Sequence, residues 1–232
     1  MITSSENEKI KLLKKLKLKK YRDQENRFLV FGEHLIEEAN KYNCIEEVFT
    51  SNENKEGTLI SPILMKTINF TETPYDRVAL CKKVINNIKS DKILVLEDVQ
   101  DPDNVGALLR SASAFGFMHI ILSDRCADIY NEKTIRASKG ALFHLNIERS
   151  RNIINEVTKL QHLNYKVYST GVKGTKEYNV DRKIVLVLGN EGSGVSKELM
   201  TISDYEVVIK TKNVESLNVA IAGSILMYEW SK

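Results

Sequence analysis

Blocks of apolar residues alternate with polar segments along this chain, and their character changes near residue 90. Before that point, four-residue apolar runs alternate with segments whose apolar residues recur at helical spacing, which predicts a small α/β unit. Beyond it, longer runs rich in Val, Ile and Leu alternate with helices, a pattern typical of a parallel sheet covered on both faces. The polar stretch Asn86–Lys92 predicts a linker. We therefore expect an α/β fold with two domains, residues 1–88 and 91–232.

The pattern also predicts individual elements. In the first half these are a helix over 9–22, strands Phe28–Phe31, Glu47–Thr50 and Val78–Cys81, a helix Glu33–Tyr42, and a helix capped by Ser61 with Pro62 in its first turn. In the second half the expected strands are Ile93–Leu96, Ile120–Leu122, Val167–Ser169, Ile184–Leu188 and Val207–Ile209. The expected helices there are Asn104–Phe115, Arg151–His162 and Ser216–Trp230.

Composition narrows the class of protein. The chain has 232 residues, 42% hydrophobic and 28% charged, as in an ordinary globular protein. Since no apolar stretch approaches the roughly 20 residues of a membrane helix, we expect no membrane association. The three cysteines are far apart, and neither Cys-x-x-Cys nor His-x-x-x-His occurs. We therefore expect no metal site and a reducing, cytoplasmic location.

Positive charge is concentrated near the N-terminus. Between Lys9 and Arg27 the acids are only Asp23 and Glu25, and the bases are Lys9, Lys11, Lys14, Lys15, Lys17, Lys19, Lys20, Arg22 and Arg27. Such a cluster attracts a phosphate backbone. A solvated helix face with its leucines turned inward explains the same pattern equally well.

The first segment with candidate chemistry runs from Asp101 to Arg110, after a strand. Asn104 is expected at or near a helix start, where its side chain can cap free N–H groups. Arg110 follows about 1.7 turns later and could clamp a phosphate through two hydrogen bonds. Taken alone, Arg110 is equally well read as a surface residue.

The second segment is Leu188–Ser196, which carries Gly189, Gly192 and Gly194 after a strand. Glycines let a backbone approach another group closely. The spacing of Gly189 and Gly194 resembles a P-loop, but Val195 stands where that motif needs lysine, so nucleotide hydrolysis is disfavoured. Glu191 suits a cationic or hydroxyl-bearing ligand, although a solvated turn is the simpler alternative.

The third segment is Ser216–Ala220 at the start of the last predicted helix. Ser216 is a good N-cap, and Asn218 follows in the first turn. Read by itself, this is an ordinary capped helix. The three segments matter because they occur together, each where a strand gives way to a helix, the place where open α/β sheets bind ligands.

Together these residues resemble the SpoU (TrmH-like) family of the SPOUT class of RNA methyltransferases over about residues 91–231. The N-terminal part Lys14–Ala39, with Phe28-Leu29-Val30-Phe31-Gly32-Glu33, is similar to the small L30e-like domain that many members place before the catalytic domain. The resemblance implies S-adenosylmethionine as cofactor, a trefoil knot, a homodimer, and 2′-O-methylation of ribose in structured RNA, with ribosomal RNA favoured over transfer RNA.

The same resemblance implies roles for residues. Asn104 and Arg110 match the polar pair of the family's first motif, and Glu191 the acid of its second. Ser216 and Asn218 match the polar pair of the third. The loops that bind S-adenosylmethionine would be built around Gly189, Ile209 and Leu217, largely through backbone groups.

One stretch departs from the family. Many members carry Ile-Pro-Met and then glycine before the third motif, whereas this chain has Ile209-Lys210-Thr211-Lys212-Asn213-Val214-Glu215. This loop should border the cofactor, so its change leaves a second hypothesis open, a non-catalytic RNA-binding or ribosome-assembly factor. Calorimetry with S-adenosylmethionine separates the two.

Overall fold

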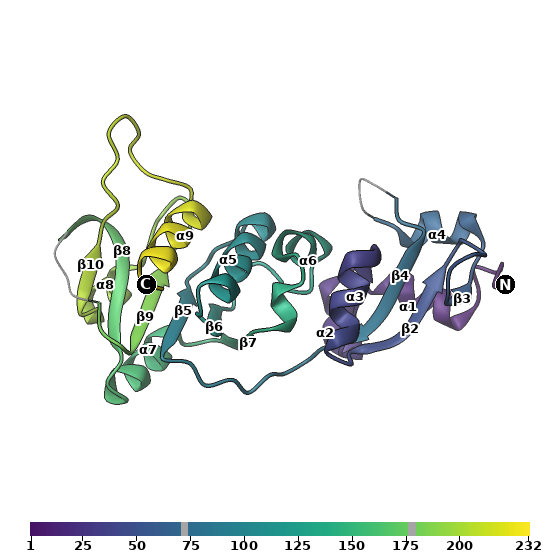
Figure 1. The fold of residues 1–232 in the computed structure, drawn as a ribbon, viewed down its shortest axis with the longest axis horizontal. Helices are drawn as coiled ribbons and strands as arrows, with labels where there is room; N and C mark the ends of the chain where they lie inside the picture. The colour runs from purple at the N-terminus through teal and green to yellow at the C-terminus, as the bar shows by residue number, and fades with distance from the viewer. Residues whose placement is uncertain (71–73, 176–179) are drawn as a thin grey trace.

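The computed structural model describes residues 1–70, 74–175 and 180–232. Two sheets lie at opposite ends of an elongated molecule, joined by an extended segment between β4 and β5 (Figure 1). The N-terminal elements are α1 (Glu8–Lys15), α2 (Lys19–Glu25), β1 (Arg27–Phe31), α3 (Glu33–Lys41), β2 (Ile45–Thr50), β3 (Thr58–Leu59), α4 (Pro62–Ile68) and β4 (Arg77–Lys82). These strands form a sheet in the order β1-β4-β2-β3, in which β4 pairs antiparallel with both of its neighbours.

The C-terminal sheet has the order β10-β8-β9-β5-β6-β7, and all its paired strands are parallel. Its elements are β5 (Lys92–Leu96), α5 (Pro102–Ala114), β6 (His119–Ser123), α6 (Glu132–Ser138), the 3-10 helix η1 (Ala141–Phe143), β7 (Asn146–Ser150), α7 (Ile153–His162), β8 (Lys166–Thr175), β9 (Ile184–Leu188), α8 (Lys197–Ile202), β10 (Tyr205–Val207) and α9 (Val219–Glu229). The expected α/β class with a parallel second sheet is confirmed.

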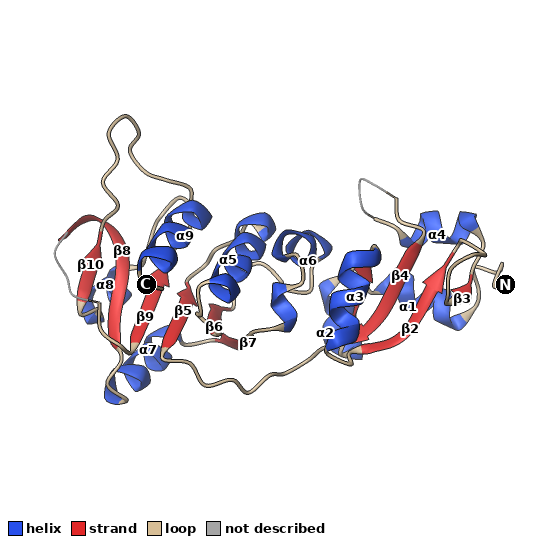
Figure 2. Ribbon diagram, in the orientation of Figure 1, coloured by secondary structure: helices blue, strands red, loops and turns tan. Residues whose placement is uncertain are grey.

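Helices cover both faces of this sheet, which explains its uninterrupted apolar strands (Figure 2). Side chains alternate along a strand, so neighbours in β5 face opposite ways. Ile93 and Val95 pack with residues of α7 and α8, whereas Leu94 and Leu96 pack with residues of α5 and α9. The carboxyl ends of the strands are thereby left to carry the polar loops.

The two parts share one hydrophobic core. Phe28 of β1 packs against Tyr130 of the C-terminal part, with ring centroids 4.6 Å apart. Beside them, Arg22 and Asp128 form an ion pair at 2.7 Å, with side chains only 6% and 11% exposed. The connecting segment is anchored as well, because Asn86 donates hydrogen bonds to the carbonyls of Phe143 and Leu145.

Several expectations need correction. The helix expected over 9–22 is two helices, separated at residues 16–18. Arg22, counted in the basic cluster, is buried in the ion pair with Asp128, and Arg27 pairs with Glu46. Leu13 and Leu16 are turned inward as the alternative proposed. The pattern also missed β7, α6 and α8. Within the described ranges we find no helix with the length and apolar character that crossing a membrane requires.

Candidate active site

The site lies where β5 and β9 end side by side. These strands pair in parallel register, with Leu96 opposite Leu188. After β5 the chain runs through residues 97–101 into α5, and after β9 it runs through residues 189–196 into α8. Because parallel strands end at one edge, two of the three segments singled out from the sequence meet there.

A chain of side-chain hydrogen bonds joins all three segments. Asn218 donates from Nδ2 to Oδ1 of Asn104 at 2.9 Å, and Asn104 donates from Nδ2 to Oε1 of Glu191 at 3.0 Å. Both lie within the normal range for such bonds. Asn104 is thus bonded to one residue 114 positions further along the chain and to another 87 positions further along.

The helix caps differ from the sequence expectation. Asp101 caps α5, accepting from the N–H groups of Asp103 and Asn104 at 2.8 and 2.9 Å, so the side chain of Asn104 is free to reach across the site. Asn218, not Ser216, caps α9, accepting from the N–H groups of Ala220 and Ile221. The helix begins later than expected, and Ser216 lies in the preceding loop.

Glu191 is fixed as a carboxylate. It accepts from Asn104, from the backbone N–H groups of Gln100 and Asp101 at 3.4 and 3.3 Å, and from Asn190. Burial by itself would raise the pKa of Glu191, but these hydrogen bonds outweigh it and bring the pKa below its usual value. The site therefore carries a negative charge at neutral pH.

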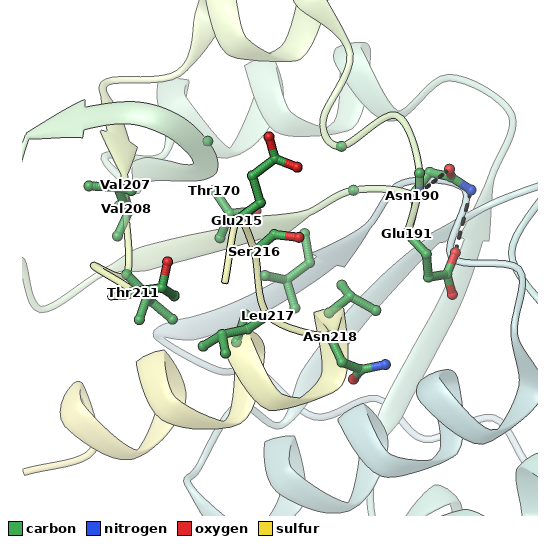
Figure 3. A pocket seen from close by; sticks show the side chains of 18 of the residues that line it. Thr170, Asn190, Glu191, Val207, Val208, Thr211, Glu215, Ser216, Leu217 and Asn218 are labelled. Atoms are coloured by element: carbon green, nitrogen blue, oxygen red, sulfur yellow. Dashed lines mark hydrogen bonds between the residues drawn. The ribbon is translucent and has the colours of Figure 1, made fainter. Parts of the chain in front are cut away.

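A cavity of about 750 Å³ opens beside this network (Figure 3). Its walls come from the ends of β9 and β10, the loop after β9 and the loop before α9. The residues that line it include Thr170, Leu188, Gly189, Asn190, Glu191, Ile209, Thr211, Glu215, Ser216, Leu217 and Asn218. The structure thus brings Gly189, Ile209 and Leu217 together around one cavity with Glu191, Ser216 and Asn218. Its volume suits a small-molecule ligand.

Gly189 is needed for backbone packing. A Cβ there would lie 2.1 Å from the carbonyl carbon of Gly194 and 2.3 Å from the nitrogen of Val195. Asn190 and Gly194 close the loop with two backbone hydrogen bonds, and Gly194 has φ +70°, a conformation that favours glycine. The close approach is therefore between two stretches of the same loop that forms the cavity wall.

Arg110 lies apart from the network. It is exposed on α5 and does not line the cavity, and its side chain makes no hydrogen bond or ion pair with the described residues. Within the described residues Asn104 makes no hydrogen bond to Arg110, because its side chain is bonded to Glu191 and Asn218. The next residue, Ser111, is bonded to Ser224 of α9 at 2.7 Å, which places Arg110 near the α5–α9 seam.

Sequence reasoning missed Asn190. Its Nδ2 donates to the carbonyl of Asp98, and its Oδ1 accepts from the N–H groups of Gly192 and Ser193. Asn190 therefore ties the loop after β9 to the loop after β5. An amide directly after Gly189 was the available signal. The described residues contain no group of three or more His, Cys, Asp or Glu side chains placed to hold a metal ion.

The family assignment is decided by a match of residues 91–228 to the SpoU rRNA Methylase family. The chain belongs to this family. Residues 7–80 match the MRM3-like substrate binding domain, and the sequence resemblance is thereby confirmed. A relative from Bacillus subtilis, 23S rRNA (guanosine(2553)-2′-O)-methyltransferase RlmP, is 34% identical over 242 residues, covering 98% of this chain and 97% of its own.

Two solved structures share this architecture over nearly the whole chain. A putative RNA methyltransferase of the TrmH family from Porphyromonas gingivalis is 30% identical, with a TM-score of 0.82 and 97% of each chain covered. An AdoMet-bound rRNA methyltransferase from Sinorhizobium meliloti is 25% identical, with a TM-score of 0.84 and coverage of 98% of this chain and 95% of its own. Both similarities include the N-terminal part, so the combination of the two sheets in one chain is shared with these structures.

Proposed function

We propose that the protein transfers a methyl group from S-adenosylmethionine to a ribose 2′-hydroxyl of 23S ribosomal RNA. The observation that carries this is the bonded set Asn218–Asn104–Glu191 at the rim of the cavity, in a chain of the SpoU family. Over nearly its full length the chain is similar to a ribosomal RNA 2′-O-methyltransferase, which favours ribosomal over transfer RNA.

The cavity fits S-adenosylmethionine in size and chemistry. The walls offer backbone groups around Gly189, Ile209 and Leu217 for an uncharged base and ribose, and the carboxylate of Glu191 lies at the rim for a cationic ligand. When bound, this cofactor supplies a methyl group on a positively charged sulfur that leaves readily. The altered loop 209–215 still contributes Ile209, Lys210, Thr211 and Glu215 to the cavity, which argues against the non-catalytic alternative.

The chain's own residues must orient a sugar hydroxyl and polarise it. Asn104 and Asn218 hold the rim through their mutual hydrogen bond, and Ser216 offers a hydroxyl to the same cavity. We assign Arg110 to clamping the phosphate next to the reacting ribose. A guanidinium keeps its proton at neutral pH, so it cannot act as the base but can bind an anion. The group that accepts the hydroxyl proton is left open.

We propose a homodimer that forms through the seam of α5 and α9. Ile221 and Tyr228 of α9 are 54% and 51% exposed and lie seven residues apart, on one helix face. Two large exposed apolar side chains on one face favour a protein partner. In such a dimer, Arg110 would reach the cavity of the second copy, which accounts for its position away from the cavity of its own chain.

We also propose a trefoil knot in the C-terminal part, domain boundaries at 1–88 and 91–232, and a cytoplasmic location.

The test is to map ribose methylation in ribosomal and transfer RNA from cells with and without the gene. We expect one 23S position to lose its methyl group, and the guanosine named for the Bacillus subtilis relative is the first candidate. Purified protein with S-adenosylmethionine and unmodified 23S RNA should restore that methylation. Loss of a transfer RNA methylation instead would contradict the substrate. Absence of S-adenosylmethionine binding at millimolar concentration would contradict the activity.

A further inference from the structure

The edge of the sheet that carries the cavity continues past β5 to β6 and β7. These strands are parallel to β5, so their carboxyl ends lie along the same edge. Arg125 follows the end of β6, and Arg149 and Arg151 lie at the end of β7. Strands β6 and β7 lie between β5 and the N-terminal part in the view of Figure 1. The three arginines therefore follow strands on that side of the sheet.

Arg149 holds the loop that follows β6. Its Nη1 donates to the carbonyls of Ser123, Asp124 and Cys126 at 2.8, 3.1 and 3.1 Å, and its Nη2 donates to that of Ala127 at 2.9 Å. A guanidinium suits this role because it presents five N–H donors in one rigid plane, whereas a lysine has three on a single atom. The loop is therefore fixed in shape although it lies at the surface.

Arg125 and Arg151 are left open to solvent. Their side chains are 78% and 94% exposed, and each forms one long ion pair at the surface, Arg125 with Asp98 at 3.5 Å and Arg151 with Asp124 at 3.6 Å. Exposed pairs of this length are weak, so a phosphate can replace either acid. Arg125 is also close to the site, because the carbonyl of Asp98 accepts from Asn190 at 2.9 Å.

The other end of the same loop meets the N-terminal part. Asp128 forms the buried ion pair with Arg22, whose Nη1 also donates to the carbonyl of Lys17 at 2.7 Å. Lys15, Lys17 and Lys20 are exposed, and no ion pair with the described residues neutralises them. A line of hydrogen bonds thus runs from the backbone of Lys17 through Arg22 to Asp128, at the end of the loop that carries Arg125.

We propose that this loop, residues 123–128, with Arg125 and Arg151, binds the phosphate backbone of the substrate RNA between the N-terminal lysines and the cavity. Arg149 is a positioning residue that holds the loop in shape. The inference rests on the proposed function, since it takes RNA as the substrate, and it adds where the catalytic part grips that RNA. Contacts of this kind are to phosphate and are independent of base sequence.

The experiment compares Arg125→Gln, Arg151→Gln and the double variant with a matched control. Arg182→Gln is that control, because Arg182 is 91% exposed, pairs with Asp91 at 3.4 Å and lies at the opposite, amino edge of the same sheet. Filter binding to in-vitro-transcribed 23S RNA is measured between about 50 and 200 mM salt. Each variant at the carboxyl edge should weaken binding roughly threefold to tenfold. Each should also make the negative slope of log K against log salt shallower by about 0.7–0.9. The control should match wild type.

Equal slopes for wild type and the double variant would overturn the inference. Calorimetry with S-adenosylmethionine and a methylation assay on wild type separate this from a failure of the proposed function. A protein that methylates but keeps its slope in the double variant refutes only the phosphate contacts. If the double variant has a shallower salt slope but wild type does not methylate RNA, only the proposed activity is refuted.

Arg149 has its own readout. In Arg149→Gln the loop loses the hydrogen bonds from the guanidinium, so hydrogen exchange at the amides of Cys126 and Ala127 should accelerate, and KM for RNA should rise with kcat retained. Arg125→Gln should leave the exchange unchanged. Unchanged exchange in Arg149→Gln would remove Arg149 from this role.

Discussion

The amide of Asn104 donates to the carboxylate of Glu191 at 3.0 Å, across two loops that leave neighbouring strands. The same amide group accepts from Asn218 through its oxygen, so both of its polar ends are used. An amide can do this because it presents a donor and an acceptor together, on two different atoms. Asn104 thus links Glu191 and Asn218, two residues that line the cavity.

Asn104→Ala should therefore lower methylation about tenfold or more, since a hydrogen bond to a charged group is worth roughly 1.5–3 kcal/mol. Asn104→Asp should be worse, because it places a second carboxylate against Glu191. Asn155→Ala is the matched control. Asn155 occupies the same position of α7, three residues after the N-cap, and lies at the surface. Initial rates with saturating S-adenosylmethionine measure the effect, and a normal rate for Asn104→Ala would contradict it.

The two glycines of the loop after β9 should differ sharply. Gly189→Ala puts a methyl group 2.1 Å from the backbone of Gly194, so the cavity wall must move, and affinity for S-adenosylmethionine should fall at least tenfold. Gly192→Ala meets only the side-chain oxygen of Asn190, at 3.5 Å, and should bind within about threefold of wild type. Calorimetry on both variants provides the comparison, and equal affinities would refute the packing argument.

Arg110→Ala should reduce kcat by about 100-fold or more while RNA and cofactor binding persist, as when a group acting on the transition state is removed. If Arg110 serves the cavity of a second copy, mixing Arg110→Ala with Gly189→Ala should regain part of the activity that each lacks alone. Arg182→Ala should behave as wild type. Failure of the mixture to exceed its components would place Arg110 at its own chain's site or outside the reaction.

Ile221→Asp should shift the protein from dimer to monomer, because it puts a charge into the apolar face of α9. Ile63→Asp is the control, since Ile63 is 75% exposed on α4, far from that helix. Sedimentation velocity distinguishes the species. A wild-type protein that sediments as a monomer at all concentrations would dispose of the proposed dimer.

The lowered pKa of Glu191 makes a pH-dependent contribution to stability. A carboxyl group whose pKa is depressed in the folded state stabilises the fold above its unfolded value and loses this effect as pH falls through the folded value. Wild type should therefore melt above Glu191→Gln at pH 7, and the gap in Tm should narrow below about pH 4. Glu53→Gln, at an exposed loop position, is the control for removing one surface carboxylate and should melt close to wild type at pH 7.

The strands of the large sheet could be predicted because burial on both faces leaves long apolar runs such as Ile184–Leu188. Strand β7 could not, since Asn146–Ser150 lies at the sheet edge and is largely polar. The three site segments could be identified because they match motifs in a known order. Their geometry could not be predicted, since Ser216 and Asn218 are both good N-caps in sequence. In the structure Asn218 caps α9 and also contacts Asn104, which is distant in sequence.

Arg22 illustrates the same limit. In sequence it is one base among many in a lysine-rich stretch, and nothing local separates it from Lys20. Its partner Asp128 lies 106 residues further along the chain. The identity of a buried ion pair of this kind is settled by tertiary contacts that local sequence patterns do not carry.

The common core around Phe28 and Tyr130 packs the two parts of the chain directly against each other. Under the proposed function, RNA bound by the N-terminal part would meet the cavity at a set distance. We therefore expect the choice of nucleotide to depend on its distance from the bound segment of the folded RNA.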